Sequence, residues 1–256
     1  MRPVSLAVIA ALGSGLVGEV AAQNRPDSPR AEVATSVEPE ALQALQRMSA
    51  YLGTLPNFTV AIDADIDVVT EDGERVRLDE QVIYKVRRPT GMVVQTTSPR
   101  RERHVIYDGK QLTVYAPRRG YYATVDAPPT IRETLGAIAD QYGINLPLVD
   151  LLRWSEPDSY RPSMLKAGYH VGPAIVDGVE TDQYAFREGD LDWQIWIQKG
   201  DKPTPRKVVI VDNIDEARPA YAGRLTWNVA PQFTAQDFAF KPGKDAKAIV
   251  LVTYEP

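Results

Sequence analysis

Apolar and polar residues alternate along positions 58–69 more regularly than anywhere else in the chain. The apolar series is Phe58, Val60, Ile62, Ala64, Ile66 and Val68, and the intervening, largely polar series is Thr59, Ala61, Asp63, Asp65, Asp67 and Val69. Because successive side chains of a strand point to opposite faces, this period of two predicts a strand with one apolar face. A turn at 71–74 leads into a second such strand, 76–86, whose apolar side is interrupted only by Glu80. These segments predict an antiparallel hairpin.

The same signals continue along the chain and are broken in the middle by helical spacing. Further strands are predicted near 92–97, 103–108, 111–116, 121–125, 168–176, 181–187, 191–198, 206–213 and 222–230. Helices are predicted from Glu38–Pro39 to Leu52, over 131–142, and over Leu146–Trp154. About eleven strands and three short helices indicate a mainly β fold of the α+β class, in which the first half is an antiparallel meander.

The first residues have the composition of a secretory signal peptide. Arg2 provides positive charge, Leu6–Val17 is apolar but short for a membrane span, and small residues precede Gln23. An amphipathic first helix or a retained anchor is the alternative interpretation. The predicted domains are a signal peptide at 1–22 cleaved after Ala22, a flexible leader at 23–37, and a single β domain at 38–256.

Composition and charge narrow the classes of partner. The 256 residues are 44% hydrophobic and 25% charged, which is typical of a globular protein. The net charge of -5 provides no basic surface for nucleic acid. The absence of cysteine excludes disulfides, thiolate metal sites and lipid attachment through cysteine. We therefore expect an exported protein that binds no nucleic acid and does not span a membrane after signal removal.

Few residues are candidates for catalysis or metal binding. His104 and His170 are the only histidines, and neither lies near a nucleophile motif or a second metal ligand. The acidic ladder Asp63, Asp65 and Asp67 offers oxygen ligands, but a solvated strand face is the simpler interpretation. No phosphate-binding loop is present outside the signal segment. We predict no catalytic residue, no metal and no cofactor, and keep as an alternative a hydrolase that pairs a carboxylate such as Glu80 with another acid.

Several segments carry a family resemblance. They are Val105–Lys110 with its Asp-Gly turn, Leu112, Tyr115–Pro117, Tyr121–Tyr122 and Thr234–Gly243. These segments resemble the periplasmic lipoprotein-carrier superfamily, and the order of elements over about residues 38–250 resembles a DUF2092-type predicted periplasmic protein. The resemblance implies a curved antiparallel sheet that forms an open half-barrel, with the helices plugging its concave side and 234–243 as a closing strand.

The resemblance also implies a function in the periplasm of a Gram-negative-type envelope. Relatives carry lipids or acylated proteins, so we expect a binding or carrier protein for an apolar ligand, either a lipid or the acyl chain of a lipoprotein. The alternative is an envelope sensor or scaffold that binds another envelope protein through the same cavity or a sheet edge.

The apolar strand faces and the helix at 146–154 define a candidate ligand cavity, because a large curved sheet covered by three short helices is underfilled. The predicted cavity residues are Phe58, Val60, Ile62, Ile66, Leu78, Val82, Tyr84, Leu148, Leu151, Leu152, Trp154, Trp193, Ile195 and Trp227. The simpler interpretation is that these side chains fill an ordinary core.

Arginines provide a second candidate site. Alternate connections of a meander lie at the same end of the sheet, so Arg100, Arg101, Arg103, Arg118 and Arg119 should gather there, together with Arg75. We predict that they receive an anionic head group or an acidic partner, and the alternative is that they are independent loop residues.

Overall fold

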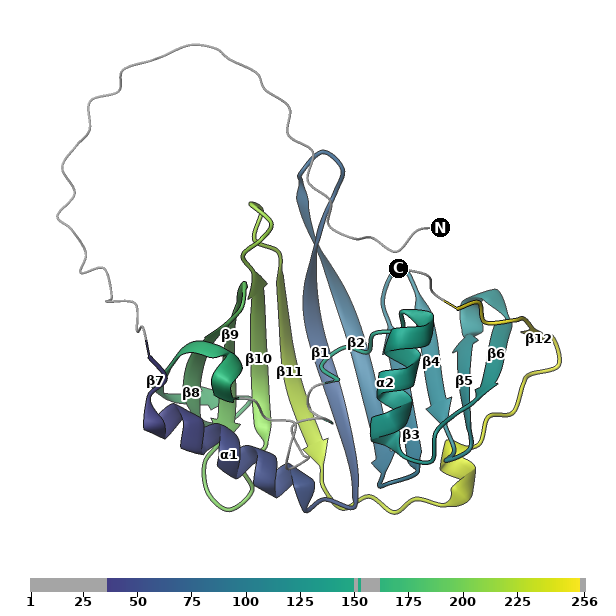
Figure 1. The fold of residues 1–256 in the computed structure, drawn as a ribbon, viewed down its shortest axis with the longest axis horizontal. Coiled ribbons are helices and arrows are strands. Elements are labelled where there is room, and N and C mark those ends of the chain that lie inside the picture. Colours follow the sequence, from purple (N-terminus) through teal and green to yellow (C-terminus); the bar gives the residue numbers. More distant parts are fainter. Residues whose placement is uncertain (1–35, 150–151, 153–161, 254–256) are drawn as a thin grey trace, which may run out of the picture.

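The computed structural model describes residues 36–149, 152 and 162–253. Within these residues, twelve strands form one sheet in the order β12-β6-β5-β4-β3-β2-β1-β11-β10-β9-β8-β7 (Figure 1). The strands are β1 (Asn57–Val69), β2 (Arg75–Arg87), β3 (Gly91–Thr97), β4 (Glu102–Tyr107), β5 (Gln111–Ala116), β6 (Tyr121–Asp126), β7 (Leu165–Val176), β8 (Val179–Glu188), β9 (Leu191–Gln198), β10 (Pro205–Asp212), β11 (Ala220–Asn228) and β12 (Lys247–Ala248). The helices are α1 (Pro39–Gly53) and α2 (Ile131–Tyr142), with short 3-10 turns η1 (Pro117–Arg119), η2 (Pro162–Met164) and η3 (Ala235–Phe238).

Two meanders meet where the first strand of one pairs with the last strand of the other. Strands β1 to β6 are consecutive neighbours, as are β7 to β11, and β1 pairs antiparallel with β11 from Thr59↔Asn228 to Ile66↔Tyr221. Among the strands of the described residues, only the short β12 pairs parallel, with β6. The two edges of the described sheet, β7 and β12, do not meet. The open, curved and mainly β architecture predicted from the sequence is confirmed.

Register places the apolar positions of neighbouring strands on one face. Val60 pairs with Tyr84 and Ile62 with Val82, so the alternation seen in 58–69 continues across β2. A one-residue slip would turn these side chains to the opposite face, which is why burial of one face specifies the register. The predicted hairpin is therefore present with its predicted apolar face.

Both helices lie on this apolar face (Figure 1). Helix α1 begins with Pro in its first turn and buries Ala41, Ala44, Leu45, Met48 and Leu52. Helix α2 is capped by Thr130, whose hydroxyl oxygen accepts from the Glu133 N–H at 3.2 Å. In Figure 1, α1 lies in front of the second meander and α2 in front of the first. The prediction that helices plug the concave side is confirmed for these two.

Two predicted elements differ from the structure. Residues 234–243 do not form a closing strand, because Asp237 accepts hydrogen bonds from the Thr234 N–H and hydroxyl at 2.8 and 2.9 Å and turns the chain into η3. The closing strand is β12, which comes later. The predicted helix 146–154 is described only through 149 and at 152, and its residues 147–149 form a turn, with Leu148 at a φ of 51°.

The predicted signal peptide lies outside the described residues, as does the leader except for Ser36 and Val37. Val37 makes a parallel bridge to Gly168 of β7, and the next residue, Glu38, donates its N–H to the Gly168 carbonyl at 2.8 Å. None of the helices in the described part of the chain has the length and apolar character to cross a membrane.

Candidate functional site

The lower part of the concave face, next to the helices, is a packed core. Among the predicted cavity residues, those buried in the same cluster as the α1 and α2 side chains are Phe58, Val60, Ile62, Val82, Tyr84, Leu152, Trp193 and Ile195. Ring contacts add to this packing, since Trp193 stacks on Phe186 with centroids 4.3 Å apart. The structure brings these residues together.

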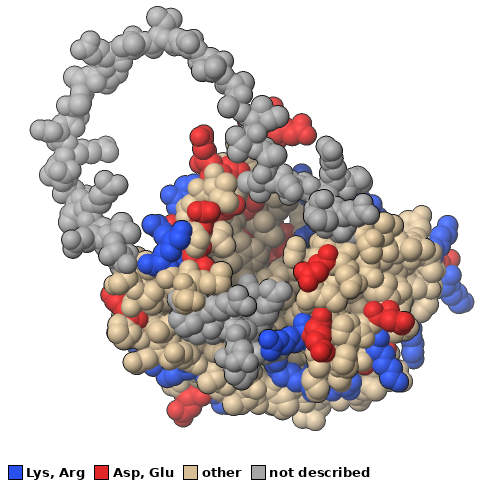
Figure 2. Space-filling model, in the orientation of Figure 1, with Lys and Arg blue, Asp and Glu red and all other residues tan. Residues whose placement is uncertain are grey.

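The upper part of the same face is not covered in this way. Along β1, Phe58 to Ala64 are buried on this face, whereas Ile66 is half-buried. Along β2 the exposed fraction rises from 3% at Glu80 to 39% at Val76. Figure 2 shows a hollow on this face, between the β1–β2 and β10–β11 hairpins and α2. The hollow is therefore walled in part by apolar side chains that the helices leave accessible.

The remaining predicted cavity residues fall into three places. Ile66 and Leu78 lie on the concave face at the hollow, and each is half-buried. Trp227 and Leu148 pack, partly buried, against the core, and Trp227 donates its indole N–H to the Pro205 carbonyl at 2.8 Å. Leu151 and Trp154 lie outside the described residues.

A charged side chain, Glu80, lies at the boundary between core and hollow. It occupies an apolar-face position of β2 and is 3% exposed. Its Oε2 is 3.5 Å from Arg101 Nη2, whereas Oε1 is buried without a hydrogen-bond partner among the described residues. The arginine partner explains how a carboxylate is tolerated at this depth.

Arg103, on β4, lies close to this carboxylate on the same face. Its Nη2 donates to the Asn145 carbonyl at 3.1 Å, and its Nε is buried and unpaired within the described structure. Burial lowers the pKa of Arg103, the nearby Arg101 charge lowers it further, and Glu80 opposes the shift. Tyr84 likewise donates its hydroxyl to the Pro147 carbonyl. Arg103 and Tyr84 therefore hold the segment after α2 over the sheet.

Tyr221, on β11, completes the polar group at the floor of the hollow. Its hydroxyl is buried without a partner in the part of the chain that the structure describes. Burial raises the pKa of Tyr221, and the negative charge of Glu80 raises it further. The phenol therefore keeps its proton at neutral pH and can donate a hydrogen bond.

Some of the predicted arginines form hydrogen bonds or ion pairs within the protein, and the others are exposed. Besides Arg101 and Arg103, Arg118 is engaged, since its Nε lies 3.5 Å from Glu102 and its Nη1 donates to the Pro99 carbonyl at 3.2 Å. That last contact joins the β3–β4 and β5–β6 connections, as the meander predicted. Arg100 and Arg119 are exposed there.

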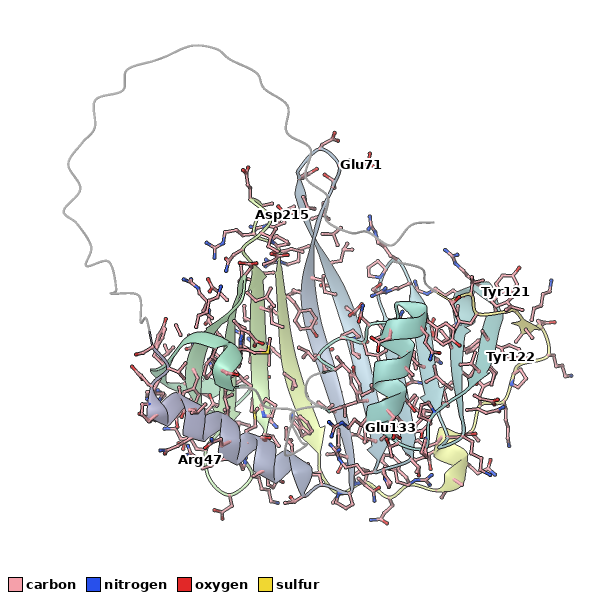
Figure 3. All side chains as sticks on the ribbon, in the orientation of Figure 1. Arg47, Glu71, Tyr121, Tyr122, Glu133 and Asp215 are labelled. Carbon is pink, nitrogen blue, oxygen red and sulfur yellow. The ribbon has the colours of Figure 1, made fainter. Side chains whose placement is uncertain are left out.

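Arg75 does not join this group, contrary to the prediction. It belongs to the positions of β2 that face away from the hollow, and it donates to the Ala217 carbonyl at 3.2 Å and approaches Asp67 at 3.7 Å. The alternation of side chains thus separates Arg75 from Arg103. On this side of the rim the hairpin tips carry acids, and Figure 3 shows Glu71 and Asp215 at the tips of the β1–β2 and β10–β11 hairpins.

The acidic ladder on β1 is only partly a solvated face. Asp63 and Asp65 are exposed, but Asp67 is 8% exposed and accepts bonds from Arg77 at 2.9 and 3.3 Å and from the Ala220 N–H at 3.2 Å. The solvated interpretation is wrong for Asp67, because the following hairpin and β11 cover it. The described residues contain no group of three or more His, Asp or Glu side chains that is arranged to hold a metal ion.

The two histidines lie far apart in the sheet, on β4 and on the edge strand β7. His104 is 3.4 Å from Glu102, and His170 is 3.4 Å from both Glu40 and Asp182. His170 thereby links α1 to β8. Each ring is held by carboxylates in a structural contact.

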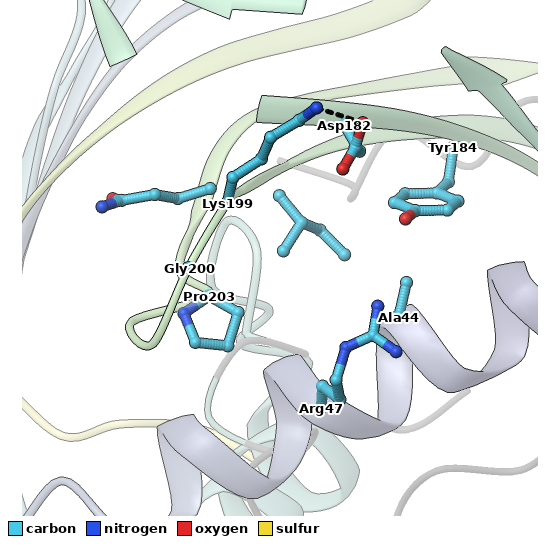
Figure 4. A pocket seen from close by; sticks show the side chains of 9 residues that line it. Ala44, Arg47, Asp182, Tyr184, Lys199, Gly200 and Pro203 are labelled. Carbon is cyan, nitrogen blue, oxygen red and sulfur yellow. Dashed lines mark ion pairs between the residues drawn. The ribbon is translucent and has the colours of Figure 1, made fainter. Parts of the chain in front are cut away.

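A separate pocket of about 260 Å³ lies between α1 and the β8–β9 region (Figure 4). Arg47, Asp182, Tyr184 and Lys199 give it a polar lining, and Lys199 is paired with Asp182 at 3.1 Å. A lining of paired charges does not suit an acyl chain. The hollow above the core is therefore the better candidate for an apolar ligand.

Sequence reasoning missed Tyr221 and the small residues Ala64 and Gly223 beside it. Gly223 pairs with Ala64, which in turn pairs with Glu80. The signal for Glu80 was present, since a single charge in an apolar series marks a position that needs a partner. No local pattern marks Tyr221, because its role depends on the pairing of β11 with β1.

The architecture defines an open half-barrel, with helices on the concave face and a hollow that remains accessible above them. The chain belongs to the DUF2092 family of predicted periplasmic proteins, whose model matches residues 41–252. This family description agrees with the periplasmic location predicted from the sequence. None of the curated proteins matches the chain.

Similar solved structures include three with distant sequences. An uncharacterized conserved protein from Thermus thermophilus is 11% identical, with a TM-score of 0.47 and coverage of 82% of this chain and 99% of the other. The lipoprotein LppX of Mycobacterium tuberculosis is 11% identical, with a TM-score of 0.46 and coverage of 76% and 98%. The LolA superfamily protein NE2245 from Nitrosomonas europaea is 11% identical, with a TM-score of 0.39 and coverage of 78% and 97%.

Proposed function

We propose that this protein binds an apolar ligand, such as a lipid or the acyl chain of a lipoprotein, in the hollow of its concave face. One observation carries the proposal: the apolar series of β1 and β2 continues past the helices into the hollow, where Ile66, Leu78 and Val76 remain partly accessible. Apolar side chains that line a concave surface are the usual wall of a ligand site.

The core beneath the hollow supports the proposal by fixing its floor. Phe58, Val60 and Ile62 are at most 2% exposed, so the lower sheet is filled by protein side chains. Along β1 in the described structure, room for an apolar ligand therefore begins above Ala64, between the hairpins and α2. The predicted cavity is accordingly narrower than the full concave face, and Ile66 and Leu78 are its central residues.

The test compares two faces of one strand. Delipidated protein is heated with and without palmitoyl lipids, since a ligand that binds only the folded state raises the melting temperature. We expect Leu78→Gln and Ile66→Gln to lower the affinity about tenfold, which corresponds to about 1.4 kcal/mol. Ile83→Gln is the matched control, because Ile83 is 37% exposed on the opposite face of β2.

The proposal fails if no palmitoyl compound shifts the melting temperature and native mass spectrometry of protein from the periplasm finds no lipid. It also fails if Ile83→Gln weakens binding as much as Leu78→Gln, since the ligand would then not lie on the concave face.

Strand β7 favours a second candidate function, the binding of another envelope protein. It is an edge strand of the described sheet, and beyond Gly168, which Val37 bridges, its residues Val171 and Ile175 are 48% and 74% exposed. An exposed edge that carries apolar side chains can accept an extended segment of another chain as an added strand.

Photo-crosslinkers placed along β7 test this candidate in the periplasm. We expect positions 173 and 175, which pair with Asp182 and Glu180, to crosslink to one partner, and 174, on the other face, to do so far less, because an added strand contacts alternate side chains. Crosslinking without this alternation, or none at all, counts against strand addition.

A further inference from the structure

Three buried polar atoms at the floor of the hollow have no hydrogen-bond partner among the described residues. They are Oε1 of Glu80, Nε of Arg103 and the hydroxyl of Tyr221, from β2, β4 and β11. An unpaired buried group costs about 1–3 kcal/mol, and such groups in native proteins usually meet a water, an ion or a ligand. Their gathering at one place therefore indicates a site that something polar occupies.

Small residues leave space between these groups. Glu80 of β2 pairs with Ala64 of β1, and Ala64 pairs with Gly223 of β11. The two residues next to Glu80 across the sheet therefore carry only a methyl group and a hydrogen. Tyr221 leans over Gly223, with its hydroxyl 3.1 Å from the position a Cβ would take. A larger residue at 223 would displace the ring. Ala64 and Gly223 thus leave space on this face of the sheet for the Tyr221 hydroxyl.

The chemistry of the three atoms restricts what can meet them. A carboxylate oxygen only accepts, a guanidinium N–H only donates, and a phenol can do both. Because Arg101 pairs with Oε2 of Glu80, Oε1 is left to accept a bond from the occupant. A carboxylate or phosphate anion carries no donor for Oε1 and would be repelled by it.

We infer that the hollow selects acyl ligands whose polar end carries a hydroxyl or amide N–H beside a carbonyl, with Glu80 accepting from the donor and Arg103 and Tyr221 donating to the carbonyl. This inference rests on the proposed function and adds the class of head group. Residues around the hollow hold the acyl chain, and the three polar residues recognise its end.

The experiment compares three lauroyl compounds that differ only at the polar end: monolaurin, methyl laurate and laurate. Binding to wild-type protein and to Tyr221→Phe is measured by calorimetry at neutral pH. Tyr169→Phe, a tyrosine exposed on β7, is the matched control. Because the Tyr221 hydroxyl has no partner among the described residues, its removal should leave the melting temperature of the free protein unchanged or slightly higher.

We expect wild-type protein to bind monolaurin about tenfold more tightly than methyl laurate or laurate, because only monolaurin carries both a hydroxyl donor for Glu80 and an uncharged carbonyl. Tyr221→Phe removes one donor to the carbonyl, so it should weaken the binding of monolaurin and methyl laurate alike, by several-fold. Tyr169→Phe should bind all three compounds as the wild-type protein does. Equal affinities for all three compounds, or tightest binding of laurate, would overturn the head-group inference and leave the proposed function standing. Failure of all three to bind would overturn both.

Discussion

Asp67 and Asp65 lie two residues apart on the same face of β1, yet their surroundings differ. Asp65 is exposed, whereas Asp67 is bonded to Arg77 and to the Ala220 N–H. The bond from Arg77 lowers the pKa of Asp67, burial opposes this, and the Ala220 N–H and the Arg77 and Arg75 charges add to the lowering. The ionised carboxylate is therefore favoured in the folded protein.

This shift predicts an acid-sensitive contribution to stability. A lowered folded-state pKa means that the stabilisation is complete above the unfolded value of about 3.9 and is lost as the pH falls through the folded value. Asp67→Asn should lower the free energy of unfolding by about 1–2 kcal/mol at neutral pH, a modest figure because both arginines are half-exposed to water. Urea denaturation from pH 2 to 7 measures the difference.

The matched control for this change is Asp65→Asn, which should alter stability by less than about 0.5 kcal/mol at every pH. If the deficit of Asp67→Asn is constant down to pH 2, the carboxylate charge is not the source of its contribution.

Among the elements, the C-terminal segment after β11 connects the middle of the sheet with the edge at β12. It leaves β11 beside β1, inserts Phe238 against β3, and ends at β12 beside β6 (Figure 1). Phe238 is 1% exposed and packs on Phe233, with the Arg87 guanidinium 4.6 Å from its ring centroid. Phe240 lies farther along, between Tyr115 and Tyr122. The segment is therefore anchored by aromatic side chains before its strand begins.

Phe238→Ala should lower the free energy of unfolding by about 3 kcal/mol, because it removes a fully buried ring and leaves a cavity beside Gly91. Ile249→Ala, at a 51% exposed position of the same segment, should cost less than about 0.5 kcal/mol. Chemical denaturation gives both values, and similar losses for the two variants would show that the ring is no anchor.

At the scale of the whole molecule, the connections between strands carry exposed charges of both signs. Arg100 and Arg119 are exposed on the connections of the first meander, and Glu71 and Asp215 lie at the tips of the other hairpins. Exposed charges contribute little to folding but steer the approach of charged surfaces. The orientation of the protein toward an acidic surface should therefore depend on Arg100 and Arg119.

Exchange of Arg100 and Arg119 for Glu should slow uptake of a fluorescent acyl lipid from phosphatidylglycerol vesicles several-fold at low salt and flatten its salt dependence. Glu71→Lys with Asp215→Lys should accelerate uptake, since it removes repulsion on the opposite side. Stopped-flow fluorescence at two salt concentrations measures both. A wild-type rate that does not depend on salt would assign the arginines no role in steering.

The sequence by itself determined the strands, their apolar faces and the class of fold. Alternation in 58–69 and 76–86 dictates which side chains share a face, because pleating is a local property of the backbone. The break at Glu80 was visible for the same reason. Only the tertiary structure decided that β1 pairs with β11, that helices fill the lower face and leave the upper face open, and that Asp67 is buried. These features depend on contacts between residues distant in the chain, so the meeting of Glu80 with Tyr221 over Ala64 and Gly223 has no local signature.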